Sequence, residues 1–183
     1  MGRKPRVWNS SRFYHIVCRR NHREALFVYP GDYKTFLYIL SKTHQNFPFE
    51  LPAYCLMTNH FHLMLRSKEH SISKIMSLVN KRYADYYNTR YRLKGHLFEK
   101  RFYSHEITDD EGILQVSRYI HRNPLEARMV QNLEDYPWSS FPFYMIGGSP
   151  LPNYINKGII LRYFGGSEGE RGGKYVEYCL EEG

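Results

Sequence analysis

The segment "LPAYCLMTNHFHLMLRS", residues 51–67, contains two apolar runs separated by Thr58 and Asn59. Two such runs around a polar pair suited to a tight turn indicate a β-hairpin. His60 and His62 stand at the start of its second strand, and side chains two positions apart share one face of a strand. An isolated His-x-His pair is more often one buried, hydrogen-bonded histidine beside an exposed one than a metal site. A third ligand and a reacting group are needed to reverse that interpretation.

The segments around the hairpin alternate between strand and helix patterns. The order is β-α-β-β-α-β-α, which favours an α+β protein with a mainly antiparallel sheet and helices on its faces. The last of these helices should end near Asn123, because proline disfavours helical geometry in the residue before it. The expected elements are a strand at 12–19, a helix at 30–47, the hairpin at 51–67, a helix at 71–91, a strand at 95–107, a helix at 108–124 and short helices at 156–164 and 172–182.

Composition limits the class of protein. A chain of 183 residues fits one domain with a short appendage, and 26 Lys and Arg against 18 Asp and Glu give a net charge of +8. This excess suggests an anionic partner, such as nucleic acid or a membrane surface. Cys18, Cys55 and Cys179 form no CxxC pair, which argues against a disulfide framework and a cysteine zinc site. With no apolar stretch of about 20 residues and no signal peptide, we expect a reduced, cytoplasmic protein without a membrane span.

The helix at 109–123 offers the missing reacting group and ligand. Tyr119 and Asn123 are four residues apart, so they share a helix face. Both lie at the edge of an apolar stripe and should face the sheet, whereas His121 projects elsewhere and is a poor third ligand. Taken alone, the pair is also what an ordinary helix end with a packed tyrosine and an asparagine cap would show.

Two imidazoles and one amide oxygen leave coordination positions open for substrate oxygens. Imidazole favours Zn²⁺ or Ni²⁺, whereas a phosphate substrate favours Mg²⁺ or Mn²⁺. The phenol of Tyr119 would need help with its proton to act as a nucleophile. A Lewis-acid metal beside it would activate a phosphodiester, and attack would give a covalent phosphotyrosine.

Four segments resemble a known family. "MTNHFHLML" (57–65) resembles the His-hydrophobic-His motif of single-tyrosine HUH transposases, and "SRYIHRNPLEARMV" (117–130) resembles the catalytic-tyrosine segment of their REP-associated branch. "NKRYADYYNTRYRLKGHLFEKRFYS" (80–104) and "DYPWSSFPFY" (135–144) are similar to further segments of that branch. The likeness covers roughly residues 8–145, and four segments in this order are far more specific than any one of them.

The resemblance implies a ferredoxin-like HUH core at 1–146 with a C-terminal extension at 147–183. It implies that His60 and His62 hold a divalent metal, Mg²⁺ or Mn²⁺, and that Tyr119 cleaves single-stranded DNA. Cleavage would leave a 5′-phosphotyrosine and a free 3′-hydroxyl. Asn123, the third ligand, occupies the place where mobile insertion-sequence relatives usually carry Gln. The implied activity is DNA transposition at hairpin-associated sites, by a monomer or a homodimer.

A basic segment between two of the expected elements then becomes a candidate DNA-binding surface. A single lysine on a helix face is more often simply solvated, but the cluster favours DNA. Two other functions remain open, namely a nucleic-acid-binding module without chemistry and a metal-dependent phosphodiesterase that uses water. The candidate DNA-binding residues are Lys81, Arg82, Arg90, Arg92, Lys94, Lys100 and Arg101.

Overall fold

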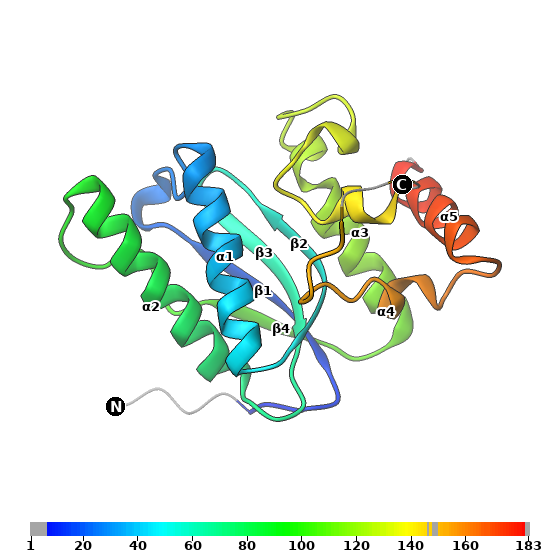
Figure 1. The fold of residues 1–183 in the computed structure, drawn as a ribbon, viewed down its shortest axis with the longest axis horizontal. Coiled ribbons are helices and arrows are strands. Elements are labelled where there is room, and N and C mark those ends of the chain that lie inside the picture. Colours follow the sequence, from blue (N-terminus) through cyan, green and yellow to red (C-terminus); the bar gives the residue numbers. More distant parts are fainter. Residues whose placement is uncertain (1–6, 146, 148–149, 182–183) are drawn as a thin grey trace.

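A computed structural model describes residues 7–145, 147 and 150–181. Within them the chain is an α+β protein with one antiparallel sheet in the order β2-β3-β1-β4, which is the ferredoxin-like arrangement expected from the sequence (Figure 1). The strands are β1 (Phe13–Arg19), β2 (Glu50–Leu56), β3 (His60–Arg66) and β4 (Tyr103–Ile107); the α-helices are α1 (Pro30–Asn46), α2 (Ile72–Tyr91), α3 (Asp110–Glu126), α4 (Gly158–Leu161) and α5 (Glu168–Leu180); and the 3-10 turns are η1 (Asn21–Arg23), η2 (Leu133–Asp135) and η3 (Phe141–Tyr144).

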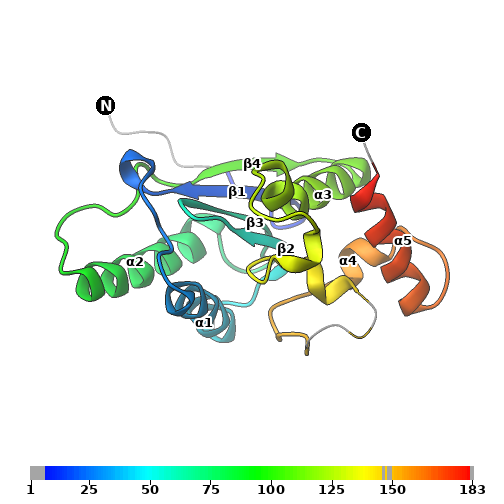
Figure 2. The same ribbon diagram turned by 90° about the horizontal axis from the view of Figure 1, so that it is seen from above.

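The sheet separates two layers of helices. Figure 2 shows α1 and α2 on one side of the sheet and α3 on the other, with α4 and α5 beyond it. The alternation of β1 matches this division, because Tyr14, Ile16 and Cys18 belong to the core beneath α1 and α2. His15 and Val17 therefore point to the opposite face, toward the α3 layer.

Side-chain caps explain where the first two long helices begin. The carboxylate of Asp32 accepts hydrogen bonds from the backbone N–H groups of Val28 and Tyr29, at 2.8 and 3.0 Å. Ser71 accepts one from the N–H of Lys74, at 3.2 Å. Such caps satisfy N–H groups that have no partner inside the helix, so both helices begin close to the predicted residues.

The strand predicted at 95–107 is shorter than expected, since only Tyr103–Ile107 pairs with β1. The residues before it follow the end of β1 irregularly, with an isolated bridge from Phe98 to Arg20. Leu97 and Phe102 are both buried in the core on the α2 side, although strict alternation would send residues 97 and 102 to opposite faces. Packing against α2 therefore overrides the strand pattern in this segment.

The predicted end of the 108–124 helix near Asn123 is also wrong. Helix α3 continues to Glu126 with Pro124 buried inside it. The proline lies in the last turn, where the Ala127 N–H still reaches the Asn123 carbonyl at 2.9 Å. Its ring fills the core instead of breaking the helix. Asn123 consequently keeps helical geometry.

The C-terminal extension packs onto the α3 layer. Tyr175 and Cys179 of α5 are fully buried there. α5 begins earlier than predicted, because Ser167 and Glu170 form a capping box. The predicted core boundary at residue 146 lies outside the described residues. In the described part of the chain, no helix is long and apolar enough to cross a membrane. Cys18, Cys55 and Cys179 are buried and form no disulfide.

Candidate active site

The two histidines of the hairpin stand on the sheet face opposite α1 and α2. Both belong to β3, and their ring centroids are 4.9 Å apart. His62 is only 3% exposed, and His60 is half-buried. The strand therefore presents two neighbouring imidazoles to the α3 layer, as the alternation predicts.

His62 has one ring nitrogen engaged and one without a partner. Its Nδ1 lies 3.0 Å from Nε2 of His15 on β1, and the two rings are stacked. Its Nε2 is buried and has no hydrogen-bond partner among the described residues. Burial, with smaller contributions from the neighbouring His60, His15 and Arg19, lowers the pKa of His62 to about 2. The ring is therefore neutral near pH 7, with a lone pair available on a ring nitrogen.

His60 is held in a similar way. Its Nδ1 lies 2.6 Å from Oδ1 of Asn59, in the turn between the two strands. An amide oxygen only accepts, so Nδ1 carries the proton and Nε2 carries the lone pair. Burial, with the charge of Arg19 as a second cause, lowers the pKa of His60 to about 4. Both histidines therefore have the electronic form of metal ligands.

Tyr119 of α3 lies against His62 and His15 within the same chain. Its ring centroid is 5.6 Å from that of His62 and 5.7 Å from that of His15, with the rings edge to face. The side chain is 53% exposed, in contrast to the buried tyrosines of the two cores. The structure thus places an accessible phenol beside the imidazoles.

Asn123 and His121 differ in their relation to the site. Asn123 lies one turn beyond Tyr119, and its Nδ2 donates to the Tyr119 carbonyl at 2.9 Å. None of its hydrogen bonds to a described residue joins it to a histidine. His121 is buried away from the pair, with Nδ1 2.6 Å from the Tyr175 hydroxyl and Nε2 2.7 Å from Oγ of Ser140. It therefore links α3 to α5 and to the residue before η3, and it is not a third ligand.

The donor set fits a divalent metal with open positions. Residues 7–145, 147 and 150–181 contain no group of three His, Cys, Asp or Glu side chains able to hold a metal ion. The candidate set predicted from the sequence is two imidazole nitrogens and the amide oxygen of Asn123, whose nitrogen donates to the Tyr119 carbonyl. The unpartnered buried Nε2 of His62 supports the fit, because such an atom normally has a partner in a folded protein. Metal-bound histidines commonly donate their other N–H to a neighbouring acceptor, and Nε2 of His15 occupies that position beside Nδ1 of His62.

Sequence reasoning missed His15 and Arg19. Both lie on the sheet face of the histidine pair, because His15 contacts His62 and Arg19 stands opposite His60 in the β1–β3 register. Alternation along "RFYHIVCR" (12–19) was a signal that His15 and Arg19 share a face. The pattern did not show that β1 would lie next to β3.

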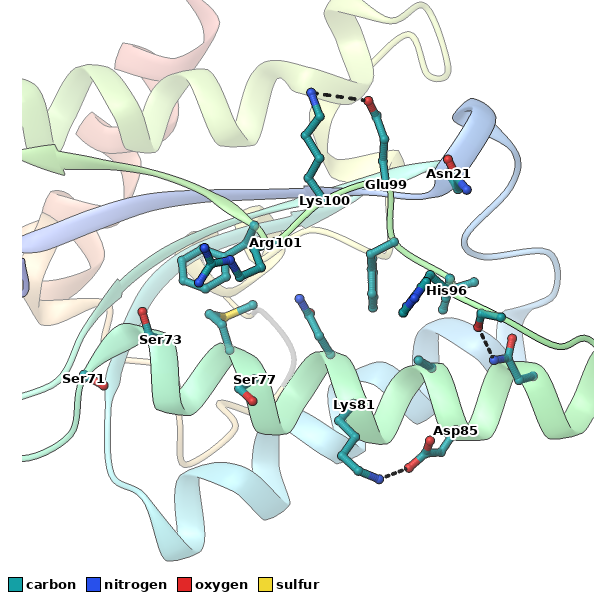
Figure 3. A pocket seen from close by; sticks show the side chains of 18 residues that line it. Asn21, Ser71, Ser73, Ser77, Lys81, Asp85, His96, Glu99, Lys100 and Arg101 are labelled. Carbon is teal, nitrogen blue, oxygen red and sulfur yellow. Dashed lines mark hydrogen bonds and ion pairs between the residues drawn. The ribbon is translucent and has the colours of Figure 1, made fainter. Parts of the chain in front are cut away.

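Three of the seven candidate DNA-binding residues line one groove. The groove has a volume of about 1060 Å³ and lies between α2 and residues 95–102, where it includes Lys81, Lys100 and Arg101 (Figure 3). Lys81 is paired with Asp85 at 2.6 Å, and Lys100 lies 3.9 Å from Glu99. Figure 3 shows Lys100 and Glu99 extending away from α2, on the side of their segment where α3 lies.

The other four residues point to different parts of the surface. Arg82 donates to the side chain of Thr43 on α1 at 3.3 Å, and Arg90 lies 3.4 Å from the buried Asp32. Arg92 caps the end of α2 in a left-handed conformation, and Lys94 is exposed in the following turn. The structure therefore divides the predicted cluster into three groove-lining residues and four residues outside the groove, of which Arg82 and Arg90 make structural contacts.

The fold and the site together define a class of protein. The class is that of ferredoxin-like α+β proteins that present a histidine pair and an accessible tyrosine at one sheet face. Residues 9–123 match the family model described as "Transposase IS200 like". The chain belongs to the IS200-like transposase family.

Two relatives resemble this chain over most of its length. A protein of Haemophilus influenzae, named provisionally as a REP-associated tyrosine transposase, is 25% identical over 141 residues, which is 70% of this chain and 78% of that protein. A solved structure of a REP-associated tyrosine transposase bound to a REP hairpin has a TM-score of 0.66 and 20% identity, and covers 86% of this chain and 93% of its own. The second likeness shows a shared fold.

Proposed function

We propose that this transposase cleaves and rejoins single-stranded DNA through Tyr119, with His60, His62 and Asn123 holding Mg²⁺ or Mn²⁺. The observation that carries the proposal is the half-exposed ring of Tyr119, 5.6 Å from the ring of His62 in the same chain. A nucleophile must be accessible to substrate and close to the groups that activate the phosphate. Membership of a transposase family supports the same chemistry.

The reaction is a transesterification. The Tyr119 oxygen attacks the phosphorus, and the bond from phosphorus to the 3′-oxygen breaks. The phenol loses its proton and the leaving oxygen gains one, which yields a 5′-phosphotyrosine and a 3′-hydroxyl. Attack by the 3′-hydroxyl of another strand reverses these changes and restores the phenol. When bound, the metal supplies Lewis-acid activation of the phosphate and stabilises the leaving oxygen.

The residues of this chain prepare the site before substrate arrives. His15 orients the His62 ring through the 3.0 Å contact at Nδ1, and Asn59 orients His60. His121 prevents α3 from rotating, because both of its ring nitrogens are engaged by groups outside the helix. Such preorganisation keeps the reacting groups aligned without reorganisation during the reaction.

We infer that the substrate is DNA that carries a hairpin. The solved relative was captured on a REP hairpin, and this chain shares its fold. The groove lined by Lys81 and Arg101 is a suitable surface for the phosphate backbone. Binding through such contacts weakens as salt rises, because each phosphate contact releases condensed counterions.

The test is covalent capture of DNA. Purified protein is incubated with fluorescent single-stranded hairpin oligonucleotides and Mg²⁺ or Mn²⁺, and adducts that survive denaturation are mapped by mass spectrometry. We expect an adduct on Tyr119 that disappears with EDTA and in Tyr119→Phe. The matched control is Tyr38→Phe, which removes the hydroxyl of another exposed tyrosine, on α1.

The rival functions give different results. A water-using phosphodiesterase would continue to cleave DNA after Tyr119→Phe and would form no adduct. A binding module without chemistry would retain the oligonucleotide equally well with EDTA, and no product would form. Either result contradicts the proposal.

A further inference from the structure

Arg19 ends β1 directly opposite His60 of β3. Opposite residues in an antiparallel pair point to the same face of the sheet, with Cβ atoms about 5 Å apart. The guanidinium group is close enough to lower the pKa of both His60 and His62, after the larger effect of burial. Arg19 therefore places a positive charge at the edge of the candidate metal site.

The guanidinium of Arg19 has no anionic partner in the described part of the chain. Its Nε is buried without a hydrogen bond. The next residue gives a contrast, because Arg20 bonds to the Ala25 carbonyl and the Tyr87 hydroxyl and pairs with Glu24 at 2.7 Å. The role of Arg20 is accounted for by the fold. The fold supplies no comparable partner for Arg19, and a buried N–H without one is unfavourable.

An open pocket adjoins this charge. It has a volume of about 410 Å³ and is lined by Arg19, Val17, Tyr103 and the segment 99–102. Val17 stands between His62 and Tyr103 in the sheet register, so the pocket borders the candidate active site. Residues 99–102 also line the groove beside α2, and the two hollows share this wall. The pocket thus offers a phosphate a position beside Arg19, at the edge of the candidate active site.

We infer that Arg19 binds a phosphate of the DNA substrate beside His60 and His62. A planar guanidinium donates two parallel hydrogen bonds to phosphate oxygens, and its charge matches a phosphodiester. The inference rests on the proposed function. It adds a coupling between the binding of DNA and the binding of the metal ion. Without DNA, the Arg19 charge opposes a divalent cation at the histidines. A bound phosphate neutralises Arg19, so DNA and metal strengthen each other's binding.

The coupling is measured in a Tyr119→Phe background, so that no cleavage occurs. Mn²⁺ is titrated by electron paramagnetic resonance, with and without the hairpin oligonucleotide that the wild-type protein cleaves. We expect the oligonucleotide to tighten Mn²⁺ binding at least fivefold when Arg19 is present. Without DNA, Arg19→Gln should bind Mn²⁺ as tightly as the parent or more tightly. Adding the oligonucleotide should tighten Mn²⁺ binding by this variant less than twofold. Lys34→Gln, which removes one exposed charge from α1 in the opposite helix layer, should leave the coupling unchanged.

Arg19→Lys provides a second variant if Arg19→Gln does not fold. It keeps the charge and loses the two-pronged contact, so Mn²⁺ affinity without DNA should stay within twofold of the parent. Its affinity for the oligonucleotide should fall at least threefold, and an unchanged DNA affinity would overturn the inference.

The outcomes separate this inference from the proposed function. Coupling that is equal in Arg19→Gln and the parent overturns the inference, while a Tyr119 adduct in the wild type still supports the function. Weaker Mn²⁺ binding by Arg19→Gln without DNA also overturns it, because Arg19 would then only support the histidines. Absence of both Mn²⁺ binding and a Tyr119 adduct defeats the function and the inference together.

Discussion

Protonation of the buried His121 should be one route by which acidification weakens this fold. The ring is 1% exposed and lies between the Tyr175 hydroxyl and Ser140 Oγ. Burial lowers its pKa from 6.5 to about 3. Because the folded pKa lies below the unfolded one, the neutral ring favours folding in full above pH 6.5. That contribution is lost as the pH falls from 6.5 toward 3.

The size of the effect follows from the two pKa values. At pH 5 an unfolded histidine is mostly protonated, while the folded His121 stays neutral. The assay pH of 5 lies about 1.5 units below the unfolded pKa of 6.5, and this difference corresponds to about 2 kcal/mol in the free energy of unfolding. Other histidines with lowered pKa values also contribute, so the comparison needs a variant that isolates His121.

The assay is urea unfolding of the wild type and His121→Asn at pH 7.5 and pH 5. Asparagine can donate and accept hydrogen bonds but does not titrate. We expect the wild type to be more stable at pH 7.5, and the gap between the two proteins to shrink by about 2 kcal/mol at pH 5. His96→Asn, at an exposed position, is the control and should show the same gap at both pH values. A His121 gap that does not change with pH would refute the reasoning.

Three further perturbations test other parts of the structure. His15→Phe removes the acceptor beside Nδ1 of His62, so Mn²⁺ affinity measured by electron paramagnetic resonance should fall by about 10- to 100-fold, and His15→Gln should lose less. Asp32→Ala removes a buried carboxylate that is bonded to two tyrosine hydroxyls and two backbone N–H groups. Urea unfolding should therefore show that the free energy of unfolding falls by about 3 kcal/mol. A fall of less than about 1 kcal/mol would contradict this account. Arg101→Gln should reduce the salt dependence of hairpin binding by about one phosphate contact. Lys81→Gln should reduce it less, because that lysine is already paired with Asp85. Equal slopes of log affinity against log salt concentration for both variants would count against the groove as a DNA surface.

Local patterns predicted most of the fold. The hairpin and the long helices follow from side-chain periodicity, which burial on one face imposes directly on the sequence. Two of the boundary errors have a different origin. Residues 95–102 pack against α2, and Pro124 is accommodated by the core, so in both places tertiary contacts outweigh the local preference.

The candidate site was predictable where its residues lie on one element. His60 and His62 share a face by alternation, and Tyr119 and Asn123 share one by helical spacing. The contributions of His15 and Arg19 depend on β1 lying beside β3, which no local pattern in the chain contains. Arg90 illustrates the same limit, because its position near the buried Asp32 is set by the packing of α2 on α1.

The strand order has a consequence for synthesis of the chain. The first strand to leave the ribosome, β1, lies in the interior of the sheet, between β3 and β4. The edge that pairs with β3 therefore stays open until residue 66 has emerged, and the edge that pairs with β4 stays open until residue 107 has emerged. Open strand edges are sites of aggregation. Tyr119 follows β4 in the chain, so the phenol can join the histidines only after the sheet is complete. A nascent or truncated chain that ends before α3 would lack the proposed cleavage activity, however well its histidines were placed.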